Sequence, residues 1–277
     1  MFRKLGRGLC SVSFSYLCKH IIQSYNMETN RFDAPQDWGM YMQQLEDKPA
    51  VTRVNIALNT VAPVDGYRYR LQLAVYYRTP TENGLPVAEE NPELWKIEDA
   101  FVELLNKVDA IDAGLMKWNN RVNFFFYAKV ADVGDELVKG LKEQFPDYEY
   151  KLWVDEDEQW EGYFLTLFPN KYSMQEIQNN KVLSALDREN DDLGKERVIE
   201  HFLLFKDEAA ANRFVEKVAE KGFVEFHRRP LEDNEYKLQI GISRPDIPDN
   251  IHNITWYLLD EAEEAGGYYD GWGCGMA

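Results

Sequence analysis

The chain has 277 residues, of which 45% are hydrophobic and 14% aromatic, which is enough apolar material for well-packed cores in about two domains. Its formal net charge of −17 excludes a surface that attracts nucleic acids by bulk charge, because an acidic protein repels phosphates. Such acidity suits a basic protein partner, or serves solubility alone. The three cysteines, Cys10, Cys18 and Cys274, provide no disulfide framework and no C-x-x-C motif, so we expect a reducing, cytoplasmic location.

The first 27 residues differ from the rest, because they contain basic side chains and no acidic one. We interpret residues 1–30 as a poorly ordered or over-called extension, with translation starting at Met27. A weak export or targeting segment is the alternative. The stretch from Leu9 to Cys18 is a poor signal-peptide core, however, and it is too short to span a bilayer.

Residues 31–170 are predicted to form a first domain. The elements, in chain order, are strands at 54–58 and 67–77, a helix at 94–108, strands at 111–118 and 121–130, a helix at 134–145 and a strand at 148–154. Asn119-Asn120 suits a tight hairpin turn, because asparagine tolerates positive φ. From Tyr67 onward the order is β-α-β-β-α-β, which is the ferredoxin-like order. Residues 155–172 are expected to form a further helix on this domain.

Residues 173–277 are predicted to form a second domain. Ser173 to Glu176 is a capping-box pattern that starts a helix, so the boundary is expected at Pro169–Tyr172. Further elements are a strand at 196–205, a helix from Asp207 to Gly222, strands at 223–226 and 236–242, and a helix at 247–265, followed by a tail. We therefore predict an α+β protein made of two tandem ferredoxin-like α/β sandwiches with mainly antiparallel sheets.

No motif points clearly to catalysis, a cofactor or a metal, and none is expected. His201 shares a strand face with Ile199 and Leu203, which favours a hydrogen-bonded core histidine over a metal ligand. Asp155-Glu156-Asp157-Glu158 could hold a cation or act in acid–base chemistry, but such a run more often forms a solvated helix start, which is the interpretation we favour.

The C-terminal tail combines aromatic residues with glycines, which is typical of a recognition surface. One interpretation is that the tail folds back and Trp272 plugs the open end of the sandwich. The other is that the tail binds a partner together with the acidic loop at 189–192 and with Glu200 on the strand predicted at 196–205. The predicted partner-binding residues are Tyr269, Asp270, Gly271, Trp272, Asp191, Asp192 and Glu200.

Residues 175–277 resemble the regulator of ribonuclease E activity B family. The resemblance rests on Val182-Leu183-x-x-Leu186 before Asp191-Asp192, on Ile199-Glu200-His201, on Gly222-Phe223 and on Tyr269-Asp270-Gly271-Trp272-Gly273, in that order. The sequence lacks the very acidic C-terminal extension of that family. Whether it inhibits a ribonuclease without such an extension is left open. Residues 37–168 resemble a separate bacterial domain family of uncharacterised function, marked by Trp38, a Lys48-Pro49 turn, the 54–58 strand and Trp160-x-x-Tyr163.

The resemblance implies a protein without catalytic activity that binds a ribonuclease E-type endoribonuclease and restrains RNA cleavage. Our leading hypothesis is therefore a non-enzymatic acidic binding protein that acts by direct protein contact, without contacting nucleic acid or membrane. A metal-dependent hydrolase that uses clustered carboxylates is one alternative, and a scaffold module is another.

Overall fold

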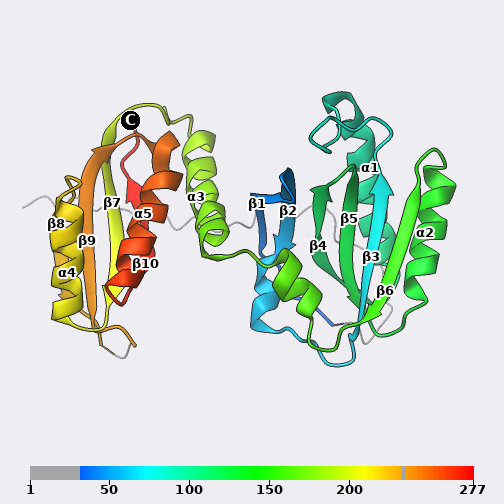
Figure 1. Cartoon of the computed structure of the whole chain (residues 1–277), viewed down its shortest axis with the longest axis horizontal. Coiled ribbons are helices and arrows are strands. Elements are labelled where there is room, and N and C mark those ends of the chain that lie inside the picture. The colour runs from blue at the N-terminus through cyan, green and yellow to red at the C-terminus, as the bar shows by residue number, and fades with distance from the viewer. Residues whose placement is uncertain (1–31, 233–234) are drawn as a thin grey trace, which may run out of the picture. The chain divides into compact units, whose positions relative to one another are not determined.

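The computed structural model describes residues 32–232 and 235–277, which form two antiparallel sheets with helices packed on them (Figure 1). The mixture of strands and helices confirms the predicted α+β class. The expectations for residues 1–30, and for Cys10 and Cys18, lie outside the described residues. Among the described residues, no helix combines the length and the apolar character needed to span a bilayer.

The first sheet has six strands in the order β1-β2-β4-β5-β3-β6. The strands are β1 (Trp38–Leu45), β2 (Lys48–Asn55), β3 (Tyr69–Tyr76), β4 (Ala110–Trp118), β5 (Arg121–Ala128) and β6 (Tyr150–Glu156). The helices are α1 (Asn91–Leu105) and α2 (Val133–Gln144), with short helical turns η1 (Ile56–Thr60), η2 (Ala88–Glu90) and η3 (Tyr163–Leu167). The elements from β3 to β6 follow the predicted β-α-β-β-α-β order, and the β1–β2 hairpin extends the sheet beyond β4.

The core of this half lies between the sheet and the helices α1 and α2. Alternate residues of β3, Leu71, Leu73 and Val75, are buried there, as period-2 patterning dictates. Phe101 of α1 stacks on Phe124 of β5 with ring centroids 4.3 Å apart. The opposite side chains of the same strands point to the other face of the sheet.

Of the two hairpin turns predicted from the sequence, one is confirmed and the other is wrong. Asn119 and Asn120 have φ values of 49° and 66°, which confirms the predicted turn. The predicted turn at Lys48-Pro49 is wrong, because the turn lies at Glu46 and Asp47, with φ values of 49° and 61°. Proline cannot adopt positive φ, so Pro49 enters the strand instead.

The segment that follows β6 is not the helix expected for residues 155–172. It turns sharply at Trp160, which has a φ of 57° and whose buried ring stacks on Tyr127 with centroids 3.9 Å apart. Asp157 accepts hydrogen bonds from the Tyr127 hydroxyl at 2.7 Å and from the backbone N–H groups of Glu161 and Gly162 at 2.7 and 2.8 Å. One acid of the 155–158 run thus caps the turn that leads into η3.

The second sheet has four strands in the order β10-β7-β9-β8. The strands are β7 (Arg197–Phe205), β8 (Val224–Pro230), β9 (Leu238–Asp246) and β10 (Gly267–Cys274). The helices are α3 (Lys171–Arg188), α4 (Glu208–Ala219) and α5 (Ile251–Glu264), with the turn η4 (Pro248–Asn250) before α5. From β7 to β10 the element order is again β-α-β-β-α-β.

The C-terminal tail is a strand of this sheet, which corrects its assignment as an extension after the last helix. β10 pairs antiparallel with β7 from Gly267 opposite Phe205 to Cys274 opposite Ile199. A bulge between Tyr269 and Gly271 interrupts the register, and Gly271 there has a φ of 142°, which glycine adopts without strain. The glycines of the tail, which are typical of a loop, therefore belong to a strand that contains a bulge.

The start of α3 also differs from its prediction. The N-cap is Asn170, whose side chain accepts hydrogen bonds from the backbone N–H groups of Tyr172 and Ser173 at 3.0 and 2.9 Å. Ser173 and Glu176 lie inside the helix and form no capping box. Asparagine caps as well as serine does, so the two positions could not be ranked by residue type alone.

The His201 side chain links β7 to β10 by a hydrogen bond within the core. It is fully buried, as its strand pattern predicts, and its Nδ1 shares a 2.8 Å hydrogen bond with the Tyr269 hydroxyl. Burial, reinforced by the positive charge of Arg244, lowers the pKa of His201 to about 3. The neutral imidazole is therefore the form that the folded state stabilises.

This shift predicts that the second sheet loses stability as the pH falls. The unfolded chain binds a proton at His201 below about pH 6.5 and the folded chain does not, so stability falls by up to about 1.4 kcal/mol per pH unit between pH 6.5 and the lower folded pKa. Urea unfolding of the wild type and of His201→Phe from pH 7.5 to pH 4.5 measures this slope. The slope should be shallower in the variant by up to that amount. Equal slopes in the two proteins would contradict the assignment.

Candidate partner-binding face of the second sheet

The second sheet buries only one of its two faces against helices among the described residues. Its inner face carries Leu203, Phe205, Ile240 and Ile242, which pack with α4 and α5. Side chains alternate along each strand, so the neighbours of these residues point to the other side. Figure 1 shows α4 and α5 beside the sheet formed by β7, β9 and β10.

The outward side chains form an apolar surface, which we call the open face. Four of its members are strongly exposed: Val198 at 53%, Val224 at 65%, Phe226 at 47% and Tyr268 at 54%. The open face is defined by Val198, Phe202, Leu204, Val224, Phe226 and Tyr268. Exposed apolar side chains gathered on one surface mark interaction sites more often than scattered ones do.

The aromatic rings of the open face support one another. The rings of Phe202 and Phe226 meet edge to face with centroids 6.0 Å apart, and Tyr268 stacks with Tyr236 at 6.1 Å. Gly241 makes room for Phe226, because a Cβ atom at that glycine would lie 2.8 Å from the tip of the Phe226 ring. These contacts hold rigid aromatic area at the surface, which reduces the entropy lost when a partner binds.

Polar side chains border the apolar area. Glu200 is exposed on β7, between Val198 and Phe202 on the same side of the strand. The Gln239 side chain accepts a hydrogen bond from Arg229 Nε at 2.8 Å and donates one to the Asp270 carboxylate at 3.5 Å. An apolar centre with a polar rim is the usual anatomy of a protein interface.

The structure brings three of the predicted partner-binding residues to this face. Glu200 and Asp270 are exposed on it, and Gly271 lies opposite Phe202 in the β10–β7 register. Tyr269 lies elsewhere: it is 5% exposed and bonded to His201 in the core, so its side chain presents no area to a partner. Ordinary strand alternation puts Tyr268 outside and Tyr269 in the core, and the bulge at Asp270 lets Gly271 lie opposite the outward Phe202.

Trp272 is tied to helix α3 and is half-buried. Its indole Nε1 donates a 2.9 Å hydrogen bond to the Asn179 side chain. Asn179 is fully buried, and its Nδ2 donates to the Thr255 hydroxyl at 2.8 Å and lies 3.2 Å from His252 Nδ1. The tail therefore folds back onto the helices, as one of the two sequence interpretations holds. A role for Trp272 in binding a partner stays a prediction.

The two aspartates of the acidic loop have different environments. Both oxygens of Asp191 accept hydrogen bonds from Arg197 Nη1 at 2.7 Å, and this pairing holds the pKa of Asp191 below its usual value. Asp191 also accepts from the backbone N–H of Ala277 at 3.3 Å, so it fixes the end of the chain. Asp192 is exposed, and its Oδ1 accepts a 3.1 Å hydrogen bond from the backbone N–H of Gly194.

The sequence reasoning missed the aromatic residues of the open face. Phe202, Phe226 and Tyr268 read as core or tail residues, because a strand with apolar side chains on both faces looks fully buried. A usable signal was present in β7, where Val198, Phe202 and Leu204 make the second face apolar as well. The predicted sandwich has helices for one face only, so these residues had to be exposed or partnered.

The carboxylates proposed for metal chemistry are engaged in the first half of the chain. Asp155 pairs with Arg70 at 2.6 Å and Glu156 with Arg68 at 3.5 Å, while Asp157 caps the turn before η3. Across residues 32–232 and 235–277, no group of three or more His, Cys, Asp or Glu side chains has the arrangement to hold a metal ion.

Comparison with solved structures and curated proteins gives weak likenesses. A crystal structure of an unknown protein from Galdieria sulphuraria has a TM-score of 0.22 and 12% identity, with coverage of 73% of this chain and 96% of the other. A putative glycine cleavage system transcriptional repressor has a TM-score of 0.24 and 8% identity, over 75% and 98% of the two chains. A protein from Bacteroides thetaiotaomicron has a TM-score of 0.17 and 10% identity, over 73% and 91%. No curated protein matches the chain.

Two family models match the chain, one in each half. Residues 36–168 match a family of unknown function, DUF695. Residues 176–274 match the family Regulator of ribonuclease activity B, and this match contains the strands and the open face described above. Each half of the chain thus matches one family model, and the two matches confirm the resemblances predicted from its motifs.

Proposed function

We propose that this protein regulates an endoribonuclease of the ribonuclease E type by direct contact through the open face of its second sheet, and that it restrains RNA cleavage without catalysing a reaction itself. The observation that carries the proposal is that the region matching a ribonuclease-regulator family bears the exposed apolar face. We also propose a cytoplasmic location, with residues 31–170 and 173–277 as separate domains.

The aromatic side chains supply the binding energy in this proposal. Burying apolar surface stabilises a complex by roughly 25 cal/mol per Å², and aromatic residues near the centre of an interface dominate its energetics. Phe226 and Tyr268 are about half exposed in the free protein, so a partner can still cover much of their area. The contacts among the rings keep that area in place before the partner arrives.

Charge supplies the selectivity and the rate of encounter. The chain carries a net charge of −17, and Glu200 and Asp270 place acids on the open face itself. A basic surface on the ribonuclease would be attracted over a distance of about 8–10 Å at physiological salt. Asp192, which is exposed in the loop between α3 and β7, adds to the same negative field.

Removing the two exposed rings is expected to weaken binding strongly. Phe226→Ala combined with Tyr268→Ala should raise the Kd for a ribonuclease E-type enzyme by about 30-fold, since two central aromatic contacts are worth about 2 kcal/mol or more. Calorimetric titration at low salt measures this change. Both side chains are substantially exposed, so circular dichroism and the unfolding midpoint should remain close to those of the wild type.

Trp95→Ala provides the matched control, because Trp95 is 57% exposed but lies on α1 beside the first sheet. It should leave the Kd unchanged. An equal loss of affinity in both variants would show that the open face is not the interface. If the wild type shows no binding to the purified enzyme at low salt, the proposed function is wrong.

Ionic strength should change the rate of association more than the rate of dissociation. Raising the salt from about 50 to about 300 mM is expected to slow association roughly tenfold, because screening weakens attraction between an acidic protein and a basic surface. Glu200→Gln with Asp270→Asn should reduce this dependence. Surface plasmon resonance over a salt series tests both statements, and a flat association rate would contradict charge steering.

A further inference from the structure

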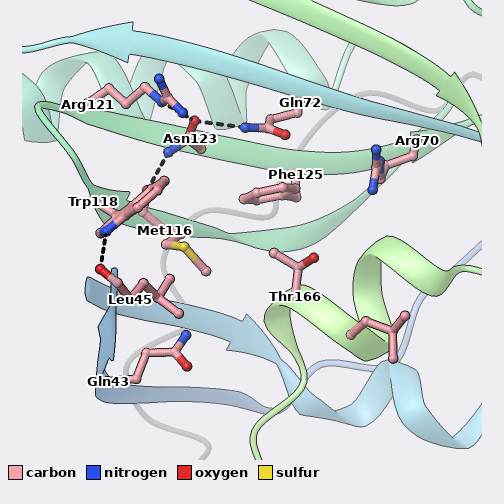
Figure 2. Close-up of a pocket in the computed structure, with 11 residues that line it drawn as sticks. Gln43, Leu45, Arg70, Gln72, Met116, Trp118, Arg121, Asn123, Phe125 and Thr166 are labelled. Carbon is pink, nitrogen blue, oxygen red and sulfur yellow. Dashed lines mark hydrogen bonds between the residues drawn. The ribbon is translucent and has the colours of Figure 1, made fainter. Parts of the chain in front are cut away.

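The face of the first sheet opposite α1 and α2 contains a pocket of about 250 Å³. It lies on the side opposite the α1–α2 core, where β3, β4 and β5 form the floor. Figure 2 shows Gln43 and Leu45 of β1, and Thr166 of η3, facing that floor across the pocket. We call it the cationic pocket and define its floor by Arg70, Gln72, Trp118, Arg121, Asn123 and Phe125.

We propose that the cationic pocket binds a small organic carboxylate that carries a flat apolar group. The volume is just below the range of about 300–1,000 Å³ typical of drug-sized ligands, so a ligand of metabolite size with a single ring fits it. This site is independent of the ribonuclease contact proposed above, because none of its lining residues belongs to the second sheet.

The charge of the pocket contrasts with that of the whole protein. Two arginines line it and no acidic residue does, although the chain has a net charge of −17. Arg70 is paired with Asp155 at 2.6 Å, but no described carboxylate lies within ion-pair distance of Arg121. Lys151 adds a further positive charge nearby, with its Nζ 4.5 Å from the centre of the Trp153 ring. An anion is therefore the ligand that the local charge favours.

Arg121 is held in place before any ligand arrives. Its guanidinium lies against the rings of Tyr76, Trp118 and Trp153, at 5.7, 6.0 and 5.5 Å from their centres. Its Nε donates a 3.0 Å hydrogen bond to the side-chain oxygen of Asn123. The stacking, the fixed Nε and a 3.5 Å hydrogen bond from Nη1 to the Tyr76 hydroxyl orient the guanidinium, whose planar shape matches a carboxylate.

Asn123 organises the polar part of the floor. It is 2% exposed, and its Oδ1 accepts from Gln72 Nε2 at 2.9 Å as well as from Arg121. Its Nδ2 donates to the backbone carbonyl of Met116 at 3.2 Å, which fixes the direction of the amide (Figure 2). The position of Arg121 thus depends on a buried, fully oriented partner.

The apolar side chains of the pocket would contact the flat group of the ligand. Phe125 and Met116 lie beside the polar cluster, and the Trp118 indole donates a 3.1 Å hydrogen bond to the Leu45 carbonyl (Figure 2). That bond fixes the indole plane at the wall of the pocket. A flat ring would contact these groups while its carboxylate meets Arg121.

Titration with phenylacetate and its uncharged counterpart phenylacetamide tests the proposal on the full chain. Phenylacetate should bind with a Kd of about 1 mM or tighter, and phenylacetamide at least tenfold more weakly. Arg121→Gln should weaken phenylacetate at least tenfold. Arg68→Gln is the matched control, because Arg68 also stacks on a ring, that of Tyr69 at 5.2 Å, but does not line the pocket.

A second measurement follows binding in the wild-type protein, in case Arg121→Gln fails to fold. Phenylacetate should shift the indole NMR resonance of Trp118, assigned with Trp118→Phe, and leave that of Trp95 unchanged. No Trp118 shift at about 10 mM phenylacetate would overturn the proposal, since it requires millimolar binding or better. Equal affinity for the acid and the amide, or for wild type and a folded Arg121→Gln, would overturn it as well.

Discussion

The pairing of β10 with β7 is the interaction on which the second half of the molecule depends. It turns a glycine-rich chain end into an edge strand, places the Tyr269 side chain beside His201 in the core, and leaves Tyr268 and Asp270 outside. The bulge at Asp270 changes the side to which the following residues point. Without this strand β7 would become an edge, and the open face would lose one of its two most exposed aromatic rings.

In the described residues, α1 and α2 cover one face of the first sheet and α4 and α5 cover one face of the second, and the two opposite faces have different chemistry. The face in the first half is a small concave site with arginines against aromatic rings, partly enclosed by β1 and η3. The face in the second half is a broader apolar surface with acidic side chains on it. One arrangement suits a small anion, and the other suits a protein. The same element order thus supports two kinds of recognition, which accords with the rule that function resides in sites and not in folds.

Much of the fold was predictable because strand periodicity is a strong local signal. The alternation in β3 and β9 and the asparagine turn at Asn119 and Asn120 led to the correct elements. β1 and β10 were missed, and the glycines of β10 resemble those of a loop. β2 was predicted only at its end, because the strand expected at 54–58 stops at Asn55 and Ile56–Thr60 forms η1. The strand character of β10 comes from pairing with a distant partner, which no local pattern reveals.

The candidate site was only partly predictable for a related reason. Composition pointed to the tail and to acidic residues, but it could not tell which of two adjacent tail residues enters the core. The register of β10 on β7 decides this, because it places Tyr269 opposite the buried Leu203. The most direct test of the central proposal is hydroxyl-radical footprinting of the protein alone and in complex with a ribonuclease E-type enzyme. The account predicts that oxidation of Phe226 and Tyr268 falls severalfold in the complex while that of Trp95 stays the same. Unchanged oxidation of Phe226 and Tyr268 in a saturated complex would contradict it.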